Sequence, residues 1–414
     1  MKALAGMLLM PFMLNNSQCR RKIDGRLLKK TRTLGNNSIS AIVFSKEDHG
    51  NSLKEYLKSK DIKIKYELPL IGAYAIEIHG GKLEDMAKVE VVRYISDDVR
   101  MSSLLDVAAQ EVGARVANET GYTGKGVGIA ILDTGVYPHQ DFIKPRNRIV
   151  AFKDFINNKQ SPYDDNGHGT FTTGVAAGNG YASGGKYKGI APEANIISIK
   201  VMDGNGAGNS SDIIAGMQWV ADHHKEYNIR VMSLSLGAEP STNRFDPLAA
   251  AVEGIWKKGI VVVAAAGNEG PKQNTITTPG ISPTIITVGA VDDKRTVDAK
   301  DDVIAEFSSR GAARGKQIKP DIVAPGVDIT ATNANKEYKG ISRQDILNEP
   351  YTKMSGTSVA TPVVSGAAAL MIGKNPEITP IQVKQSMMNN AVRMNISKYV
   401  QGSGILSIRA MMDI

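Results

Sequence analysis

The feature that most constrains the fold is an alternation of apolar runs and helical segments that begins near residue 104. Runs rich in Val, Ile and Ala predict strands over residues 127–132, 195–201, 230–234, 260–265 and 285–288. Helical spacing predicts helices over residues 171–177, 212–223, 247–257, 359–371 and 380–390. This alternation favours an α/β fold with a mostly parallel sheet covered by helices on both faces. Ligands bind such sheets beyond the carboxyl ends of the strands.

Residues 38–100 have a different pattern and predict a separate small α+β domain. Strand-like runs cover residues 39–44, 62–68, 73–78 and 89–95, and short helical patterns lie near residues 53–57 and 83–87. The order β-α-β-β-α-β is that of a ferredoxin-like unit. The polar stretch over residues 96–103 reads as a linker to the larger domain.

Charge is concentrated at the N-terminus. Residues 1–37 hold eight Lys and Arg against the single acid Asp24, a surplus that accounts for seven of the net +8. Because the rest of the chain is nearly neutral, we interpret the first 37 residues as a solvated basic leader. A basic arm could instead contact an acidic surface or nucleic acid, but the rest of the chain gives no reason to expect a nucleic-acid partner.

The leader also holds the short apolar run 3–14, which resembles a signal-peptide core. No small-x-small cleavage site follows it, and positive charge at residues 20–22 opposes translocation. The run is too short, and too interrupted by Pro11, to span a bilayer, and no other segment qualifies as a transmembrane helix. A single cysteine, Cys19, excludes an internal disulfide framework. We therefore favour a cytoplasmic monomer, with secretion through this segment as the alternative.

Two polar motifs follow predicted strands or open predicted helices. Asp133 comes directly after the apolar run 127–132, where an aspartate can orient another side chain at the sheet edge. Taken alone, an Asp-Thr-Gly turn is often only a turn. His168 lies in the sequence DNGHGT, where flanking glycines allow close approach of other groups. Alone, it is as readily a helix-starting histidine without a role.

Two further motifs complete the set. Ser358 opens a helix rich in small residues, where orphan N–H groups and the helix dipole favour negative charge. An acyl-transfer oxyanion needs that setting, although a plain N-cap is the commoner use of serine there. Asn268 follows the small apolar run 261–266, and its carboxamide N–H₂ can point at a developing oxyanion. The alternative for Asn268 is a turn residue in the left-handed region.

Together these motifs resemble the subtilisin-like (S8) serine proteases, in the chain order Asp, His, Ser. The resemblance covers roughly residues 105–410 and is strongest to the AprX-type intracellular subtilisins, through residues 163–170, 191–195, 307–311 and 319–326. It implies a serine endopeptidase in which Ser358 is the nucleophile, His168 the base and Asp133 its orienter. Asn268 and the Ser358 N–H would hold the oxyanion.

The resemblance also assigns a substrate-binding surface and a partner. Two backbone segments would flank an extended protein or peptide substrate: Ser235, Leu236 and Gly237 on one side, and Gly206, Ala207 and Gly208 on the other. No charged residue is placed to dictate the primary pocket, so broad specificity is expected. The small domain resembles the family's inhibitory propeptides, which implies a self-processed zymogen. The expected organisation is a leader (1–37), a propeptide (38–100) and a catalytic domain (101–414).

The sequence departs from the family at three places, one of which is Val359, which follows Ser358 where many members carry methionine. Phe171 stands where the family often has a second histidine, and the stretch after Ala177 is longer and richer in glycine than the usual calcium loop. No cofactor is expected for the chemistry, and a structural Ca²⁺ is left open with no metal ligands assigned.

Three other classes of protein fit the sequence less well. The glycines of residues 124–128 precede a strand, whereas a dinucleotide-binding fingerprint follows its strand. A catalytically dead binding module is disfavoured because all four chemical positions are intact. A metallohydrolase is disfavoured because the six histidines show no HExxH spacing.

Overall fold

The computed structural model describes residues 21–414 apart from 35–36, 47–48, 99, 104–111, 242–244, 295, 297–298, 300, 314–316, 339–346 and 348. Most of the expected leader, with its apolar run and Cys19, lies outside the described residues. The chain divides into two compact units, with the division between Asp98 and Val99 and residues 241–244 grouped with the first unit. Among the described residues, no helix combines the length and apolar character needed to cross a membrane.

The N-terminal unit is an antiparallel sheet with helices. Its elements are α2 (Gly25–Leu34), β1 (Ser38–Ser45), α3 (Gly50–Ser59), β2 (Lys63–Leu68), η1 (Pro69–Ile71), β3 (Ala73–His79), η2 (Gly80–Lys82), α4 (Leu83–Lys88) and β4 (Val92–Asp97). The strand order β2-β3-β1-β4 and the β-α-β-β-α-β succession agree with the ferredoxin-like prediction. Ile23 and Leu27, which precede the expected start of this domain at residue 38, are buried in its core.

The larger unit is built on an eight-stranded sheet in the order β14-β13-β12-β10-β6-β8-β7, with β17 also paired to β13. Every printed pairing in it is parallel except that of β13 with β14. The strands are β6 (Gly128–Asp133), β7 (Ile149–Asp154), β8 (Asn195–Lys200), β10 (Ile229–Leu234), β12 (Val261–Ala265), β13 (Ile286–Asp292), β14 (Val303–Ile304) and β17 (Ile322–Pro325). The predicted mostly parallel sheet is confirmed, and β7, β14 and β17 are strands that the sequence did not predict.

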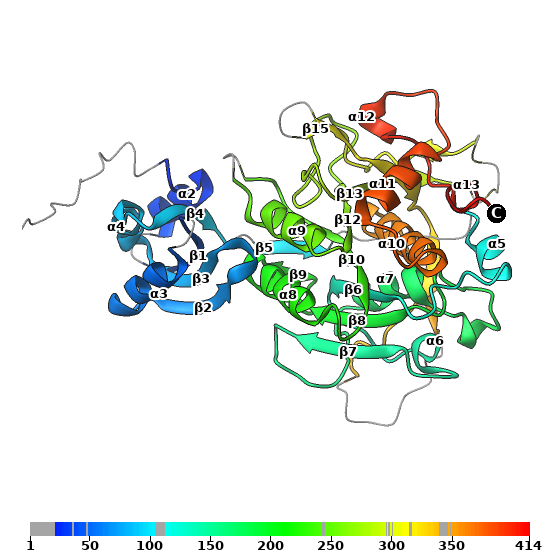
Figure 1. The fold of residues 1–414 in the computed structure, drawn as a ribbon, viewed down its shortest axis with the longest axis horizontal. Coiled ribbons are helices and arrows are strands. Elements are labelled where there is room, and N and C mark those ends of the chain that lie inside the picture. The colour runs from blue at the N-terminus through cyan, green and yellow to red at the C-terminus, as the bar shows by residue number, and fades with distance from the viewer. Residues whose placement is uncertain are drawn as a thin grey trace, which may run out of the picture. The chain divides into compact units, whose positions relative to one another are not determined.

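Smaller strands and helices surround this sheet. Outside it lie β5 (Arg100–Ser103), β9 (Ala207–Asn209), β11 (Leu236–Gly237), β15 (Gly311–Ala313), β16 (Gln317–Lys319), β18 (Ile329–Thr332) and β19 (Tyr351–Met354). The helices are α5 (Ala114–Glu119), α6 (Gln140–Ile143), α7 (His168–Ala177), η3 (Tyr181–Ser183), α8 (Ser210–His223), α9 (Pro247–Lys257), α10 (Thr357–Lys374), α11 (Pro380–Asn389), α12 (Lys398–Gln401) and α13 (Ile408–Met412). Helices α8 and α9 lie on one side of the sheet and α7 and α10 on the other (Figure 1).

Helices α7 and α10 are buried almost throughout, because their sequences carry small and apolar residues on every face. They pack against each other and against the sheet. Two glycines allow the start of α7 to touch the turn after β6. A Cβ added to Gly169 would lie 2.2 Å from the Gly135 carbonyl oxygen, and Gly135 itself has φ +114°. Close approach at this point brings the end of β6 and the start of α7 together.

Candidate active site

Asp133 and His168 meet at the carboxyl edge of the sheet. Asp133 is the last residue of β6 and His168 the first of α7, and both are at most 1% exposed. The distance from His168 Nδ1 to Asp133 Oδ1 is 2.7 Å, and to Oδ2 it is 3.0 Å. The Thr134 N–H and the Thr172 hydroxyl also donate to this carboxylate, at 2.7 and 3.1 Å. A carboxylate fixed by other donors holds the imidazole in one orientation.

Asp164 joins the two segments that carry this pair. It is fully buried and accepts the Thr134 hydroxyl at 2.9 Å on one oxygen, and the Thr170 N–H and hydroxyl at 2.8 and 2.7 Å on the other. The Gly167 N–H also donates to it, at 2.8 Å. Thr134 follows Asp133, and Thr170 lies two residues after His168. The Asp164 carboxylate therefore locks the strand end to the helix start.

Asn268 lies beside the N-terminus of α10. Its Oδ1 accepts two hydrogen bonds from Thr357, from the backbone N–H and from the hydroxyl, each at 3.0 Å. The Thr357 hydroxyl oxygen in turn accepts the Gly267 N–H at 3.2 Å. Since these bonds occupy the amide oxygen, they fix which way the carboxamide points and leave Nδ2 as an available donor.

Ser358 is the second residue of α10, in the first turn, where backbone N–H groups lack intrahelical acceptors. Its side chain is buried, and among the described residues Oγ has no hydrogen-bond partner. The adjacent Thr357 contacts Asn268, and α10 packs on α7, the helix that begins at His168. The side-chain hydrogen bonds that would link Ser358 into a relay form only loosely in many free enzymes.

The two predicted substrate-flanking segments lie on either side of one extended strand. That strand is β5, four residues of this chain that follow shortly after β4. Leu236 and Gly237 of β11 pair antiparallel with Ser103 and Ser102. On the other edge, Asn209, Gly208 and Ala207 of β9 pair antiparallel with Arg100, Met101 and Ser102. Gly206 and Ser235 immediately precede these pairings. Each of the two segments therefore pairs with an extended strand through its backbone.

The carboxylate of Asp141 anchors the loop that follows α7 by accepting hydrogen bonds from it. Asp141 accepts the Gly180 N–H at 3.1 Å, the Ala182 N–H at 2.9 Å and the Tyr351 hydroxyl at 2.9 Å. Hydrogen-bond donors thus surround this carboxylate, where a cation would need further oxygen ligands. In the part of the chain that the structure describes, no group of three His, Cys, Asp or Glu could hold a metal ion.

Sequence reasoning missed the residues that support the predicted ones: Thr172, Asp164, Thr357 and Asp141. The spacing offered a partial signal, because Asp164 lies four residues before His168, and Thr172 lies one helical turn after it. Their partners come from other segments of the chain, so their roles became visible only in three dimensions.

Comparisons with known proteins agree with this architecture. The family model described as "Subtilase family" (Peptidase_S8) matches residues 124–404. The chain is 41% identical to Serine protease AprX of Bacillus subtilis over 342 residues, which cover 80% of this chain and 77% of that protein. It is 30% identical to Subtilisin E of the same organism, over 86% of this chain and 85% of that one. The chain belongs to the subtilase family and is a serine endopeptidase.

Among solved structures, the fold is similar to that of fervidolysin from Fervidobacterium pennivorans, a keratinolytic enzyme related to subtilisin. The TM-score is 0.72 at 21% identity, and the match covers 92% of this chain. This chain spans 61% of the length of fervidolysin, and at this identity the likeness concerns the fold alone. The mixed α/β architecture predicted from the sequence is therefore that of a subtilisin-like protein.

Proposed function

We propose that this endopeptidase cleaves peptide bonds through an acyl-enzyme formed on Ser358, with His168 as general base and Asp133 as its orienting carboxylate. The observation that carries the proposal is the buried contact of 2.7 Å between His168 Nδ1 and Asp133 Oδ1. A proton held on Nδ1 by the carboxylate leaves Nε2 with a lone pair, which is the atom a base must present to a serine hydroxyl.

The reaction follows from these positions. Ser358 Oγ attacks the scissile carbonyl carbon while its proton passes to His168 Nε2. The resulting oxyanion accepts hydrogen bonds from Asn268 Nδ2 and the Ser358 N–H. As the C–N bond breaks, His168 gives the proton to the leaving amine, and an ester to Ser358 remains. Water, deprotonated by His168, then attacks the ester and releases the acid and the free serine.

Labelling with a fluorophosphonate tests the nucleophile. We expect a stoichiometric adduct on Ser358 of the matured enzyme and none in Ser358→Ala. Asn268→Leu should still be labelled on Ser358, but its kcat should be lower by about 10²–10³. Absence of any adduct after removal of the N-terminal unit would favour a binding module and contradict the proposal.

The N-terminal unit is proposed to be an inhibitory propeptide that starts before the predicted residue 38, since Ile23 and Leu27 are buried in its core, and that ends near residue 100, followed by a catalytic domain (101–414). Two observations support this. The division between compact units falls at Asp98, and residues 100–103 lie between β9 and β11, where an extended substrate would pair. The chain would thus occupy its own substrate site until it is cut nearby.

Processing is tested with Ser358→Ala. The variant should remain a single chain of 44.4 kDa, whereas the unmodified protein should release its N-terminal unit. A variant that is still trimmed near residue 100, when purified away from other proteases, would exclude self-cleavage. Sequencing the mature N-terminus from cell and medium fractions tests the proposed cytoplasmic location against secretion. Light scattering on the mature enzyme tests the proposed monomer.

The substrate class is proposed to be proteins or peptides in extended form, with broad sequence tolerance. Backbone pairing with β9 and β11 supplies affinity that does not depend on side chains. Cleavage of a peptide library should show weak residue preferences at several substrate positions and no strong preference at any one of them. A strict requirement for one charged residue at the cleavage site would contradict this proposal.

We also propose that the loop after α7 needs no calcium. Asp141 already engages two loop N–H groups and Tyr351, and the loop's own charged side chains are the lysines Lys186 and Lys188. Adding a chelator such as EDTA should leave the melting temperature of Ser358→Ala unchanged. A drop of several degrees that Ca²⁺ reverses would show a structural cation.

A further inference from the structure

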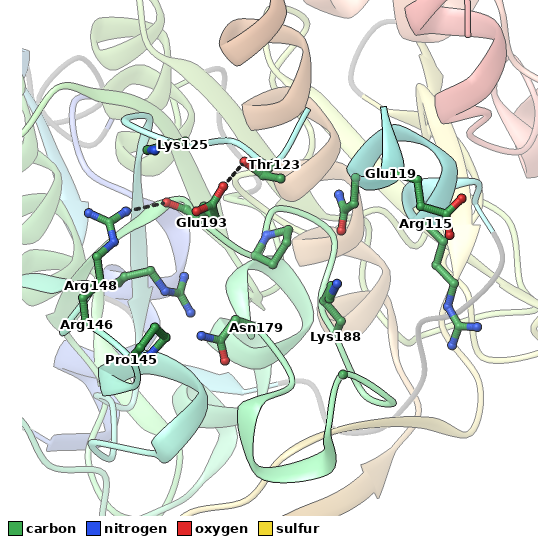
Figure 2. Close-up of a pocket in the computed structure, with 13 residues that line it drawn as sticks. Arg115, Glu119, Thr123, Lys125, Pro145, Arg146, Arg148, Asn179, Lys188 and Glu193 are labelled. Atoms are coloured by element: carbon green, nitrogen blue, oxygen red, sulfur yellow. Dashed lines mark hydrogen bonds between the residues drawn. The ribbon is translucent and has the colours of Figure 1, made fainter. Parts of the chain in front are cut away.

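A basic pocket of about 1020 Å³ opens in the larger unit, and its lining includes none of the proposed catalytic or substrate-binding residues. Three segments form it: the stretch from α5 toward β6, the loop between α6 and β7, and the segment that follows α7. Its basic side chains are Arg115, Lys125, Arg146, Arg148 and Lys188 (Figure 2). The name "basic pocket" refers to this cavity.

Positive charge in the basic pocket exceeds the negative charge that it contains. Its two acids are Glu119 and Glu193, and the Glu193 carboxylate accepts the Thr123 hydroxyl at 2.6 Å rather than pairing with a cation (Figure 2). The Arg146 guanidinium reaches only the Glu193 backbone oxygen, at 3.4 Å. Among the described residues, none of the five basic side chains forms an ion pair within 4 Å.

Arg148 is a buried cation on the wall of this pocket. It is 2% exposed, and its two terminal nitrogens donate to the backbone oxygens of Ala194 and Asp141. Its Nε–H is buried and has no hydrogen-bond partner in the part of the chain that the structure describes. Burial, and then the charge of Arg146, lower the pKa of Arg148 to about 10, against the opposing charges of Asp141 and Glu193, so it is still cationic at neutral pH. A buried cation that forms no salt bridge among the described residues and has an unused donor is costly.

We propose that the basic pocket binds a small polyanion that carries two or more phosphate groups. Guanidinium groups match phosphate oxygens with paired N–H donors, and lysines add point charges. The volume is that of a site for a drug-sized ligand, more than a single oxyanion needs. The surplus of five basic over two acidic side chains suits several negative charges. An anion here would offset the buried charge of Arg148 and offer an acceptor for its Nε–H, directly or through water.

Bound polyanion would bridge the three segments that form the pocket, so it should stabilise the larger unit without entering the chemistry. The site does not depend on the proposed catalytic roles, since it shares no residue with them. Inorganic tripolyphosphate and adenosine triphosphate both carry the linked phosphate groups that the basic pocket would bind. Only adenosine triphosphate also carries a nucleoside, which can add contacts.

The test uses the full-length chain carrying Ser358→Ala, which prevents autolysis during the measurement. Sodium tripolyphosphate is titrated at constant ionic strength, with calorimetry and thermal unfolding as readouts. We expect saturable 1:1 binding and a melting temperature that rises with ligand concentration. Exchanging two rim charges, as Arg146→Gln with Lys188→Gln, should weaken affinity at least tenfold. Both side chains are exposed, so this variant should fold.

The matched control is Lys257→Gln with Lys258→Gln, which removes the same charge from an exposed pair at the end of α9. It should bind like the parent protein. Tighter binding of adenosine triphosphate than of tripolyphosphate would identify a nucleotide as the ligand, and equal binding would identify the phosphate chain. Either result supports the site. Absence of saturable binding, or equal loss of affinity in both double variants, would overturn it.

Discussion

Two buried histidine–aspartate pairs lie in the larger unit, and although the residue types are the same, the two pairs have different roles. In the first, the carboxylate of Asp133 faces the ring of His168, with Nδ1 and Oδ1 2.7 Å apart. In the second, His139 Nδ1 accepts the backbone N–H of Asp141 at 3.1 Å, and the nearest carboxylate oxygen is 3.5 Å away. His139 is therefore the N-cap of α6, and the Asp141 carboxylate turns to the loop after α7.

The two histidines differ in their tautomer, because the partner of Nδ1 is an acceptor in one pair and a donor in the other. A carboxylate can only accept, so His168 must carry its proton on Nδ1, and Nε2 is left to act as a base. A backbone N–H can only donate, so His139 must accept on Nδ1 and carries any proton on Nε2, which is buried. The histidine–aspartate pairing alone does not make a base, because the partner of Nδ1 decides the tautomer.

Replacing each histidine by alanine gives the largest expected contrast. His168→Ala should lower kcat by about 10⁶, the size of loss established for Asp-His-Ser triads. His139→Ala should leave kcat nearly unchanged but lower the free energy of unfolding by about 1–2 kcal/mol through the lost cap. His139→Asn, which can still cap, should recover most of that stability. Steady-state kinetics and urea unfolding measure both effects. Comparable kcat losses in the two alanine variants would remove the distinction.

Replacing each aspartate by asparagine should give the same contrast between the two pairs, with a smaller difference in kcat. Asp133→Asn is expected to lower kcat by about 10⁴, because an amide permits the wrong imidazole tautomer. Asp141→Asn should keep kcat while destabilising the loop after α7, since charged acceptors make stronger hydrogen bonds, worth about 1.5–3 kcal/mol. Proteolytic susceptibility of residues 178–190, measured in the Ser358→Ala background, monitors the loop. Unchanged susceptibility in Asp141→Asn would argue against its role.

A pair of neighbouring threonines tests the support of Asp133. The Thr172 hydroxyl lies 3.1 Å from both the Asp133 carboxylate and the Gly169 oxygen, whereas the Thr173 hydroxyl donates only to the Gly169 oxygen, at 2.6 Å. Thr172→Val should lower kcat about tenfold with little change in KM, and Thr173→Val should not. Thr172→Ser, which retains the hydroxyl, should restore most of the activity. Equal kcat values for the two valine variants would mean that Thr172 has only a packing role.

The smallest expected effect is a pH dependence of stability that belongs to His139. Burial is the main cause that lowers its pKa, while the Asp141 charge opposes the shift. The unfolded chain therefore binds a proton more readily, and the stability that His139 contributes is lost as the pH falls below about 6.5. Unfolding free energies of the wild type and His139→Asn at pH 8 and pH 5 measure it. An equal loss of stability in both proteins would assign the dependence to other groups.

Patterns among neighbouring residues in the sequence predicted many of the helices and strands. The run of six small apolar residues before Asn268 became β12, and Thr379 with Pro380 started α11 through a capping box. These signals are carried by neighbouring residues, so a single stretch of sequence contains them. The strand β7 was missed because its pattern is weak, with Ala151, Phe152 and Lys153 only half-buried.

The sequence by itself determined the chemical identity of the proposed site: an aspartate after a strand, a histidine between glycines, a serine at a helix start and an asparagine after a strand. Only the tertiary structure decided which acceptors and donors hold these groups, as Asp164 and Thr357 do. It also decided that His139 is a cap whereas His168 faces a carboxylate. Hydrogen bonds act over about 3 Å, and residues far apart in the chain reach that distance only when the sheet and its helices are packed.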